Sequence, residues 1–220
     1  MSVMILVPVK NLENAKERLS PVLRRAERRA LAEAMLQDVL AALANVNHHT
    51  RVAVVSSDPM AIALAERYRF AIIPDPANLG ESDAIEHATG HCVALGEDNS
   101  MVIPGDIPLV QAEDIERVLA AAPAQGSVLV PGWDGRGSNA VLRRPADLFP
   151  LRFGNDSFQP HLRAAQVTGM PCVVLRLPRV GLDVDNPADL AQLLAAEGNT
   201  RAQQLLRSWN LEPQALAAHD

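Results

Sequence analysis

The stretch VMILVPV, from Val3 to Val9, decides the fold that the rest of the sequence predicts. Its apolar residues follow one another without a break. Such runs of Val, Ile and Leu are typical of strands that are covered on both faces, as in a parallel sheet. The sequence repeats this kind of run at positions 52–57, 70–73, 101–106, 127–131 and 172–177. We therefore expect Val3–Val9 to be a buried strand of a mostly parallel sheet.

Helical patterns lie between these runs. Every fourth position from Leu31 to Leu43 is apolar, which gives a helix one apolar face. Asp58–Pro59 and Asn186–Pro187 each place a capping side chain before a proline that suits the first turn of a helix. Further helical patterns cover 112–122 and 186–198. Alternating strands and helices with short connections predict an α/β fold with three layers, α/β/α, around a mostly parallel central sheet.

The length of 220 residues fits one domain with one sizeable core. We expect this domain to cover residues 1–197. Residues 198–220 are interpreted as a C-terminal accessory helix or tail that packs on the domain or contributes to a homodimer. Its apolar positions are Leu205, Leu206, Trp209 and Leu216.

The composition argues against several classes of partner. The formal net charge is -6 and only 3% of the residues are aromatic. A broad basic surface for nucleic acid or an anionic membrane is therefore not expected, nor is an aromatic platform for single strands. Cys92 and Cys172 lack the spacing of a metal site, and one pair is no disulfide framework, which favours a reduced, cytoplasmic protein. The run at 3–9 is too short to span a membrane.

Polar residues follow the apolar runs, where ligands bind in open parallel sheets. Pro8 and Lys10 lie at the end of the first run, Ser57 and Asp58 at the end of the second, and Asp106 at the end of the fourth. We expect these side chains to gather at one edge of the sheet as a binding site.

The only two lysines of the chain, Lys10 and Lys16, lie close together near Arg18, whereas the other 18 basic residues are all arginine. A compact ammonium is a point charge suited to phosphate. The alternative is that a codon bias removed most lysines and that these two remain on a solvated face.

Three acidic residues are candidate metal ligands. Asp183 and Asp185 are two positions apart, so that both carboxylates project from one face if the segment is extended. Such a pair, together with Asp106, suits Mg²⁺. Alternatively, Asp185 serves only the following helix and Asp106 only a turn between prolines. With the three cations opposite, the set would suit a nucleoside triphosphate with Mg²⁺.

Two segments rich in Gly, Ser and Asn, 135–141 and 153–161, are interpreted as loops that could cradle a phosphate or a carboxylate. Their candidate polar groups are Ser138, Gly154, Ser157 and His161, with Arg136 and Arg152 as possible anion partners. Each segment could equally be a simple turn, and His161 a buried structural residue.

The ordered set of these motifs carries a resemblance over about residues 4–195. It comprises VPVKNLENAKERLS, MLQDVLAAL, VAVVSSDP, PGDIPLV, GSNAVL, FGNDSFQPH and LDVDNPADL. In this order they resemble the phospholactate guanylyltransferase family of coenzyme F-420 biosynthesis. The resemblance implies a nucleotide-diphospho-sugar transferase-like fold, similar to the molybdenum-cofactor guanylyltransferases. It also implies transfer of GMP from GTP to 2-phospho-L-lactate, phosphoenolpyruvate or 3-phospho-D-glycerate, with release of pyrophosphate.

The resemblance also implies roles for single residues. Pro8, Lys10, Lys16 and Arg18 would form the triphosphate-binding loop, and Asp106, Asp183 and Asp185 would bind Mg²⁺. Ser138, which stands where the family usually has threonine, would bind the phospho-acid with Gly154 and Ser157.

One departure concerns the nucleoside. The family commonly has a Leu-Asn-x-Ala-Leu motif at the start of a helix, and this chain reads NLGESDAIEHA, with Asp83 interpreted as the residue in place of the asparagine. Two alternatives remain open from the sequence. One is a nucleotidyltransferase for a sugar phosphate or molybdopterin, although the glycine-rich loop of the molybdopterin enzymes is absent. The other is a nucleotide-binding sensor or a glycosyltransferase-like protein.

Overall fold

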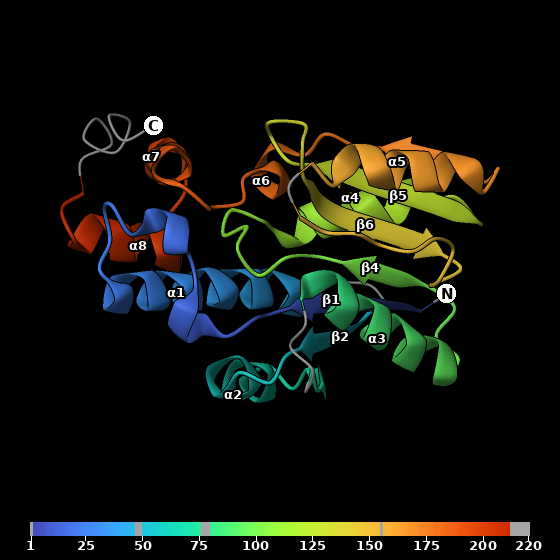
Figure 1. The fold of residues 1–220 in the computed structure, drawn as a ribbon, viewed down its shortest axis with the longest axis horizontal. Coiled ribbons are helices and arrows are strands. Elements are labelled where there is room, and N and C mark those ends of the chain that lie inside the picture. The colour runs from blue at the N-terminus through green and yellow to red at the C-terminus, as the bar shows by residue number, and fades with distance from the viewer. Residues whose placement is uncertain (1, 47–49, 76–79, 155, 212–220) are drawn as a thin grey trace.

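The computed structural model describes residues 2–46, 50–75, 80–154 and 156–211, which form a three-layer α/β/α fold (Figure 1). The central sheet has seven strands in the order β3-β2-β1-β4-β6-β5-β7. These strands are β1 (Val3–Pro8), β2 (Thr50–Val55), β3 (Ala71–Ile73), β4 (Ser100–Val102), β5 (Gly126–Pro131), β6 (Ser138–Arg144) and β7 (Cys172–Val174). Each of the six apolar runs overlaps one strand, so the predicted α/β class and mostly parallel sheet are confirmed.

Strand β6 was not predicted. It pairs antiparallel with both β4 and β5, whereas the other four strand pairs are parallel. The interpretation of 135–141 as one loop is therefore wrong from Ser138 onward. The apolar part of β6 is only three residues long, from Ala140 to Leu142, between polar residues at both ends. This pattern is too short to stand out, yet the strand is almost wholly buried because both of its neighbours pair with it.

Helices cover both faces of the sheet. Along β1, Ile5 and Val7 face one apolar cluster and Met4 and Leu6 face the other, because successive side chains alternate. The first cluster includes residues of α1 (Arg25–Ala44), α2 (Pro59–Arg67), α4 (Ala112–Ala121) and α6 (Pro178–Gly181). The second includes residues of α3 (Glu81–Ala94) and α5 (Phe158–Val167).

The predicted helix starts are confirmed. Asp58 caps α2 by accepting hydrogen bonds from the backbone of Met60 and Ala61. Asn186 caps α7 (Pro187–Ala195) through the backbone of Asp189. The apolar stripe from Leu31 to Leu43 is buried along α1.

Helix α8 (Arg201–Ser208) and α7 form a third apolar cluster with the first half of α1, beyond the sheet (Figure 1). Ala202 and Leu206 of α8 are fully buried there with Leu31 and Met35. Leu216, a predicted apolar position of the tail, lies outside the described residues. Across the described ranges, no helix combines the length and apolar character needed to cross a membrane.

Gly126 offers a test of the packing at the start of β5. Its φ is +132°, and an added Cβ would lie 2.1 Å from the carbonyl oxygen of Pro171. We expect Gly126→Ala to lower the free energy of unfolding by about 2–5 kcal/mol through backbone strain and overpacking, measured by urea unfolding. Gly90→Ala is the control, since open space surrounds Gly90 in α3. It should raise stability by up to about 1 kcal/mol, and equal effects of the two substitutions would contradict the packing described.

Candidate functional site

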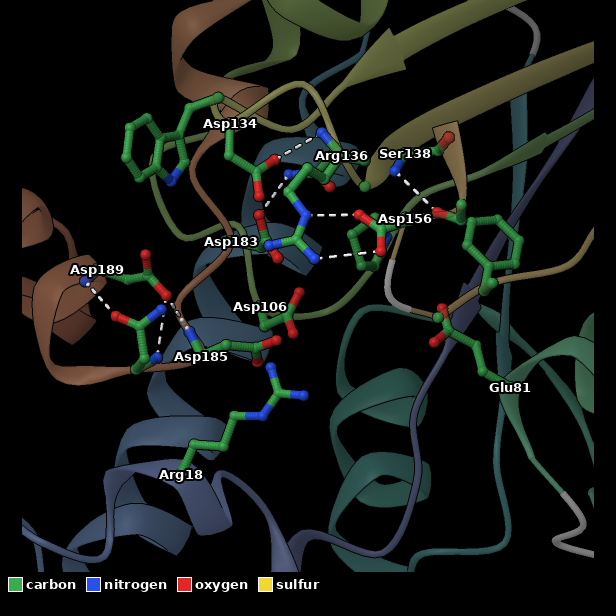
Figure 2. A pocket seen from close by; sticks show the side chains of 18 residues that line it. Arg18, Glu81, Asp106, Asp134, Arg136, Ser138, Asp156, Asp183, Asp185 and Asp189 are labelled. Carbon is green, nitrogen blue, oxygen red and sulfur yellow. Dashed lines mark hydrogen bonds and ion pairs between the residues drawn. The ribbon is translucent and has the colours of Figure 1, made fainter. Parts of the chain in front are cut away.

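Two adjoining cavities open at the carboxyl ends of the strands, and Figure 2 shows the side chains of the first. Their volumes are about 380 and 360 Å³. They share Glu81, Pro104, Asp106 and Asp185 in their walls. We call them the acceptor-side cavity, which Ser138, Gly154 and Ser157 line, and the loop-side cavity, which Pro8, Lys10 and Lys16 line.

The loop after β1 forms one wall of the loop-side cavity. It contains two short 3-10 turns, η1 (Leu12–Asn14) and η2 (Glu17–Leu19). Asp58 holds this loop, because its second carboxylate oxygen accepts a hydrogen bond from the backbone N–H of Leu12 at 2.9 Å. Lys10 is exposed at the cavity, whereas the side chain of Lys16 is only 10% exposed.

The ammonium of Lys16 lies between two predicted metal ligands. Its Nζ is 2.6 Å from Oδ2 of Asp106 and 2.7 Å from Oδ1 of Asp185. Burial alone would lower the pKa of Lys16, but the charges and hydrogen bonds of the two carboxylates raise it above its usual value. For Asp185, burial would raise the pKa, but Lys16 lowers it below its usual value. Both groups are therefore charged at neutral pH.

The backbone joins the segments that carry the three aspartates. The N–H of Val184 donates to the carbonyl of Asp106 at 3.2 Å, which brings residues far apart in sequence together. Asn139 of β6 donates to Oδ1 of Asp183 at 2.9 Å and also to the carbonyls of Val180 and Gly181. Burial, with the charge of Asp106, nevertheless raises the pKa of Asp183 to about 6. The side chain of Asp183 is thus held in one orientation, but its ionised form is only weakly stabilised.

The aspartates line one cavity but are not grouped as ready metal ligands. No set of three His, Cys, Asp or Glu side chains is close enough to hold a metal in the part of the chain that the structure describes. The Lys16 ammonium occupies the position between Asp106 and Asp185 instead. Oδ1 of Asp106 is buried and has no hydrogen-bond partner among the described residues. A buried carboxylate oxygen without a partner is costly unless a cation approaches it.

A hydrogen-bonded cluster forms the opposite wall. Oγ of Ser157 accepts from the backbone N–H of Ser138 at 3.1 Å, and Oγ of Ser138 lies 2.9 Å from Nδ1 of His161. Nε2 of His161 accepts from the backbone N–H of Arg152 at 2.9 Å, which requires this nitrogen to be unprotonated. Nδ1 of the neutral ring therefore carries the proton and donates to Ser138, whose own hydroxyl proton has no acceptor among the described residues and could be donated to a ligand.

His161 is thus buried and structural, one of the two possibilities that the sequence allows. It sits in α5, since the segment 153–161, interpreted as a loop, becomes helical at Phe158. Burial, together with the charge of Arg143, lowers the pKa of His161 to about 4. The ring is therefore neutral at pH 7 and keeps the tautomer that orients Ser138. Gly154 lines the same wall with a φ of +138°, which favours glycine.

Four predicted contacts, Ser57, Asp58, Asp83 and Arg152, line neither cavity. Ser57 and Asp83 are exposed, and the carboxylate of Asp58 is engaged by backbone N–H groups of α2 and the first loop. Glu81, two residues before Asp83, lines both cavities instead. Burial raises the pKa of Glu81 to about 7, and the charge of Asp106 contributes to this shift.

The position of Glu81 follows from the register of α3. Ala84 and Ile85 are the buried pair of the first helical turn. When they take the Ala-Leu positions of the family motif, Ser82 rather than Asp83 matches its asparagine. Ser82 donates to and accepts from the backbone of Phe153 on the acceptor-side wall.

A pH-dependent stability follows from the buried His161. An unfolded histidine has a pKa near 6.5, so between about pH 6.5 and 4 the unfolded chain binds a proton that the folded chain does not. Stability should therefore fall as the pH drops, by about 2 kcal/mol at pH 5 from this group alone. Urea unfolding at pH 7.5 and pH 5 should show this loss in the natural chain relative to His161→Gln.

The comparison with a variant is needed because Asp183 and Glu81 have raised pKa values, which give the opposite trend. His87→Gln, on the exposed side of α3, is the matched control and should keep the pH dependence of the natural chain. An unchanged pH dependence in His161→Gln would contradict the neutral, buried ring.

Similar proteins support the fold. The structure of a putative nucleotide-diphospho-sugar transferase from Desulfovibrio desulfuricans G20 superposes with a TM-score of 0.79. The match covers 100% of this chain and 99% of that chain at 22% sequence identity. The nucleotide-diphospho-sugar transferase-like fold, expected from the sequence, is confirmed.

Curated relatives are more similar in sequence. The phosphoenolpyruvate guanylyltransferase of Conexibacter woesei is 36% identical over 195 residues, which cover 88% of this chain and 87% of the relative. The 2-phospho-L-lactate guanylyltransferase of Methanothermobacter thermautotrophicus is 33% identical, with coverage of 94% and 91%. The 3-phospho-D-glycerate guanylyltransferase of Colwellia psychrerythraea is 31% identical, with coverage of 91% and 95%. Residues 3–217 match the family described as "Guanylyl transferase CofC like". The chain therefore belongs to the CofC-like guanylyl transferase family, as its motifs indicated.

Proposed function

We propose that this chain transfers GMP from GTP to a three-carbon phospho-acid and releases pyrophosphate, in coenzyme F-420 biosynthesis. The acceptor is 2-phospho-L-lactate, phosphoenolpyruvate or 3-phospho-D-glycerate, the acids in the names of the relatives. The observation that carries the proposal is the pair of adjoining cavities that meet at Asp106 and Asp185. One is lined by both lysines and the other by serine hydroxyls, which suits a triphosphate beside a second phosphorylated ligand.

The first loop would bind the triphosphate of GTP. Lys10 is exposed in the loop-side cavity and would pair with phosphate oxygens there, beside Pro8. Arg18 lines the acceptor-side cavity and points toward Asp185 in Figure 2, so it would offset charge where the cavities meet. Lys16 would add its ammonium at the same place. These charges favour departure of pyrophosphate, which carries more charge as it leaves.

Asp106, Asp183 and Asp185 would hold Mg²⁺, and their chemistry fits it. All three offer hard carboxylate oxygens, and Oδ1 of Asp106 is buried without a partner among the described residues. When bound, the ion would offset the negative charge of the phosphates as a Lewis acid. The ammonium of Lys16 pairs with both Asp106 and Asp185, and it thereby keeps two like charges close together at this edge of the sheet.

The acceptor would lie against the wall that Ser138, Gly154 and Ser157 form, which we call the serine wall. The free hydroxyl proton of Ser138 would donate to the acceptor's phosphate, with Gly154 and Ser157 beside it. A phosphate oxygen of the acceptor would attack the α-phosphorus of GTP. Because this oxygen is already ionised at pH 7, no general base is required, and the protein contributes positioning and charge stabilisation.

Three further polar residues would contribute to binding the nucleoside of GTP. Ser57 and Asp83 are exposed polar groups that would reach the ribose or the base, and Asp58 would act by holding the first loop at Leu12. We also propose that the enzyme is cytoplasmic and forms a homodimer, as predicted from the sequence.

An acceptor panel tests the proposed reaction. The chain is incubated with GTP, Mg²⁺ and each of the three acids, and pyrophosphate is assayed together with the mass of the GMP adduct. We expect release that depends on at least one acid and is lost when EDTA removes Mg²⁺. GTP binding without acid-dependent release would favour a nucleotide sensor and contradict the proposal.

The two lysines should differ in what they contribute. Lys16→Met leaves the partly exposed carboxylates of Asp106 and Asp185 without their shared cation, so we expect a loss of about 1–3 kcal/mol in stability and at least roughly 100-fold in kcat. Lys10→Met removes an exposed charge, so stability should change by less than about 0.5 kcal/mol while KM for GTP rises. Near-normal turnover in both variants would rule out the triphosphate site.

A further inference from the structure

The acceptor-side cavity is strongly acidic for a site that takes an anion. Of the 18 residues in its wall, seven are Asp or Glu and two are Arg, namely Arg18 and Arg136. Figure 2 shows Arg18 on the side of Asp185, whereas Arg136 lies across the cavity next to Asp156. An acceptor with both a phosphate and a carboxylate needs positive charge at each end, and Arg136 is the basic residue of this wall on the side of the serine cluster.

The backbone fixes Arg136 beside the serine wall. Its carbonyl accepts from the N–H of Phe158 at 2.8 Å, and its N–H donates to Oδ1 of Asp134 at 2.8 Å. Two residues further on, the N–H of Ser138 donates to Ser157. The segment from Arg136 to Ser138 therefore runs along the start of α5, and the guanidinium belongs to the same wall as the hydroxyls.

The guanidinium of Arg136 already binds a carboxylate in the two-pronged manner. Nε donates to one oxygen of Asp156, and Nη2 donates to the other at 3.1 Å. Both side chains are more than 60% exposed. An exposed ion pair of this kind contributes little to stability, so it can be exchanged for another carboxylate at little cost. Asp156 thus holds the guanidinium in a geometry that fits a carboxylate ligand.

We propose that Arg136 exchanges Asp156 for the carboxylate of the acceptor, and that it thereby selects phospho-acids over phosphate monoesters without a carboxylate. This rests on the proposed function only in taking the acceptor-side cavity as the place where the phospho-acid binds. Arg136 binds the carboxylate end of the acceptor, and the serine wall binds the phosphate end. Asp156 competes with the carboxylate of the acceptor for Arg136. The acceptor displaces Asp156 because its ion pair with Arg136 is stronger and less solvated.

The test uses binding rather than turnover. Titration calorimetry measures Kd for 2-phosphoglycolate and for ethyl phosphate, two small probes that differ in a carboxylate. The proteins are the full chain, Arg136→Gln and Asp156→Asn. Arg207→Gln is the matched control, because it removes one exposed positive charge from α8 outside both cavities.

We expect the natural chain and Arg207→Gln to bind 2-phosphoglycolate at least 10-fold more tightly than ethyl phosphate. Arg136→Gln should weaken 2-phosphoglycolate about 10- to 100-fold and leave ethyl phosphate unchanged, since only a charge-assisted pair is lost. Asp156→Asn should bind 2-phosphoglycolate several-fold more tightly, because the competing carboxylate is gone.

Three outcomes would overturn the proposal: equal weakening of both probes in Arg136→Gln, no weakening of either, or no binding of either probe by the natural chain. These outcomes are separable from failure of the proposed function. Carboxylate-dependent binding without guanylyl transfer would contradict the proposed reaction but support the role of Arg136. Guanylyl transfer with equal KM for the phospho-acid in the natural chain and Arg136→Gln would support the reaction but contradict the role of Arg136.

Discussion

The ammonium of Lys16, held between Asp106 and Asp185, is the interaction on which the site depends. It joins the loop after β1, the loop after β4 and the segment before α7, which are far apart in the sequence. Without a cation at this point, two carboxylates would repel each other inside a half-buried edge of the sheet. The backbone bond from Val184 to Asp106 brings the same two segments together, but it brings no charge to balance theirs.

The sheet explains why the site has two halves. The parallel strands β1 and β4 end side by side, so their loops supply the lysines and Asp106. Strand β6 runs the other way, so it is the start of this strand that reaches the same edge and brings Ser138 and Asn139 there. Asn139 then ties Asp183 to this strand. One antiparallel strand in a parallel sheet thus places hydroxyl and amide groups opposite the cationic loop.

Much of the fold could be predicted because it rests on local signals. Continuous apolar runs marked six strands, and Asp58 and Asn186 marked helix starts. The site was harder to predict because its contacts are not local. That Lys16 would bind two aspartates, rather than stand free for phosphate, depends on burial that no sequence spacing reports. Glu81 was missed because one acid in a helix start usually serves the helix, and its exposure to both cavities comes from packing.

The most direct test of this account is a double-mutant cycle on unfolding free energy with Lys16→Met and Asp185→Asn. If the ammonium and the carboxylate interact as described, the effects of the two substitutions should not add. A coupling energy of about 1–3 kcal/mol is then predicted, because Asp185→Asn removes one of the two carboxylates that pair with the buried ammonium, and Lys16→Met removes the cation that pairs with a half-exposed carboxylate. Additive effects, with a coupling within about 0.5 kcal/mol of zero, would contradict the central place of Lys16 in this structure.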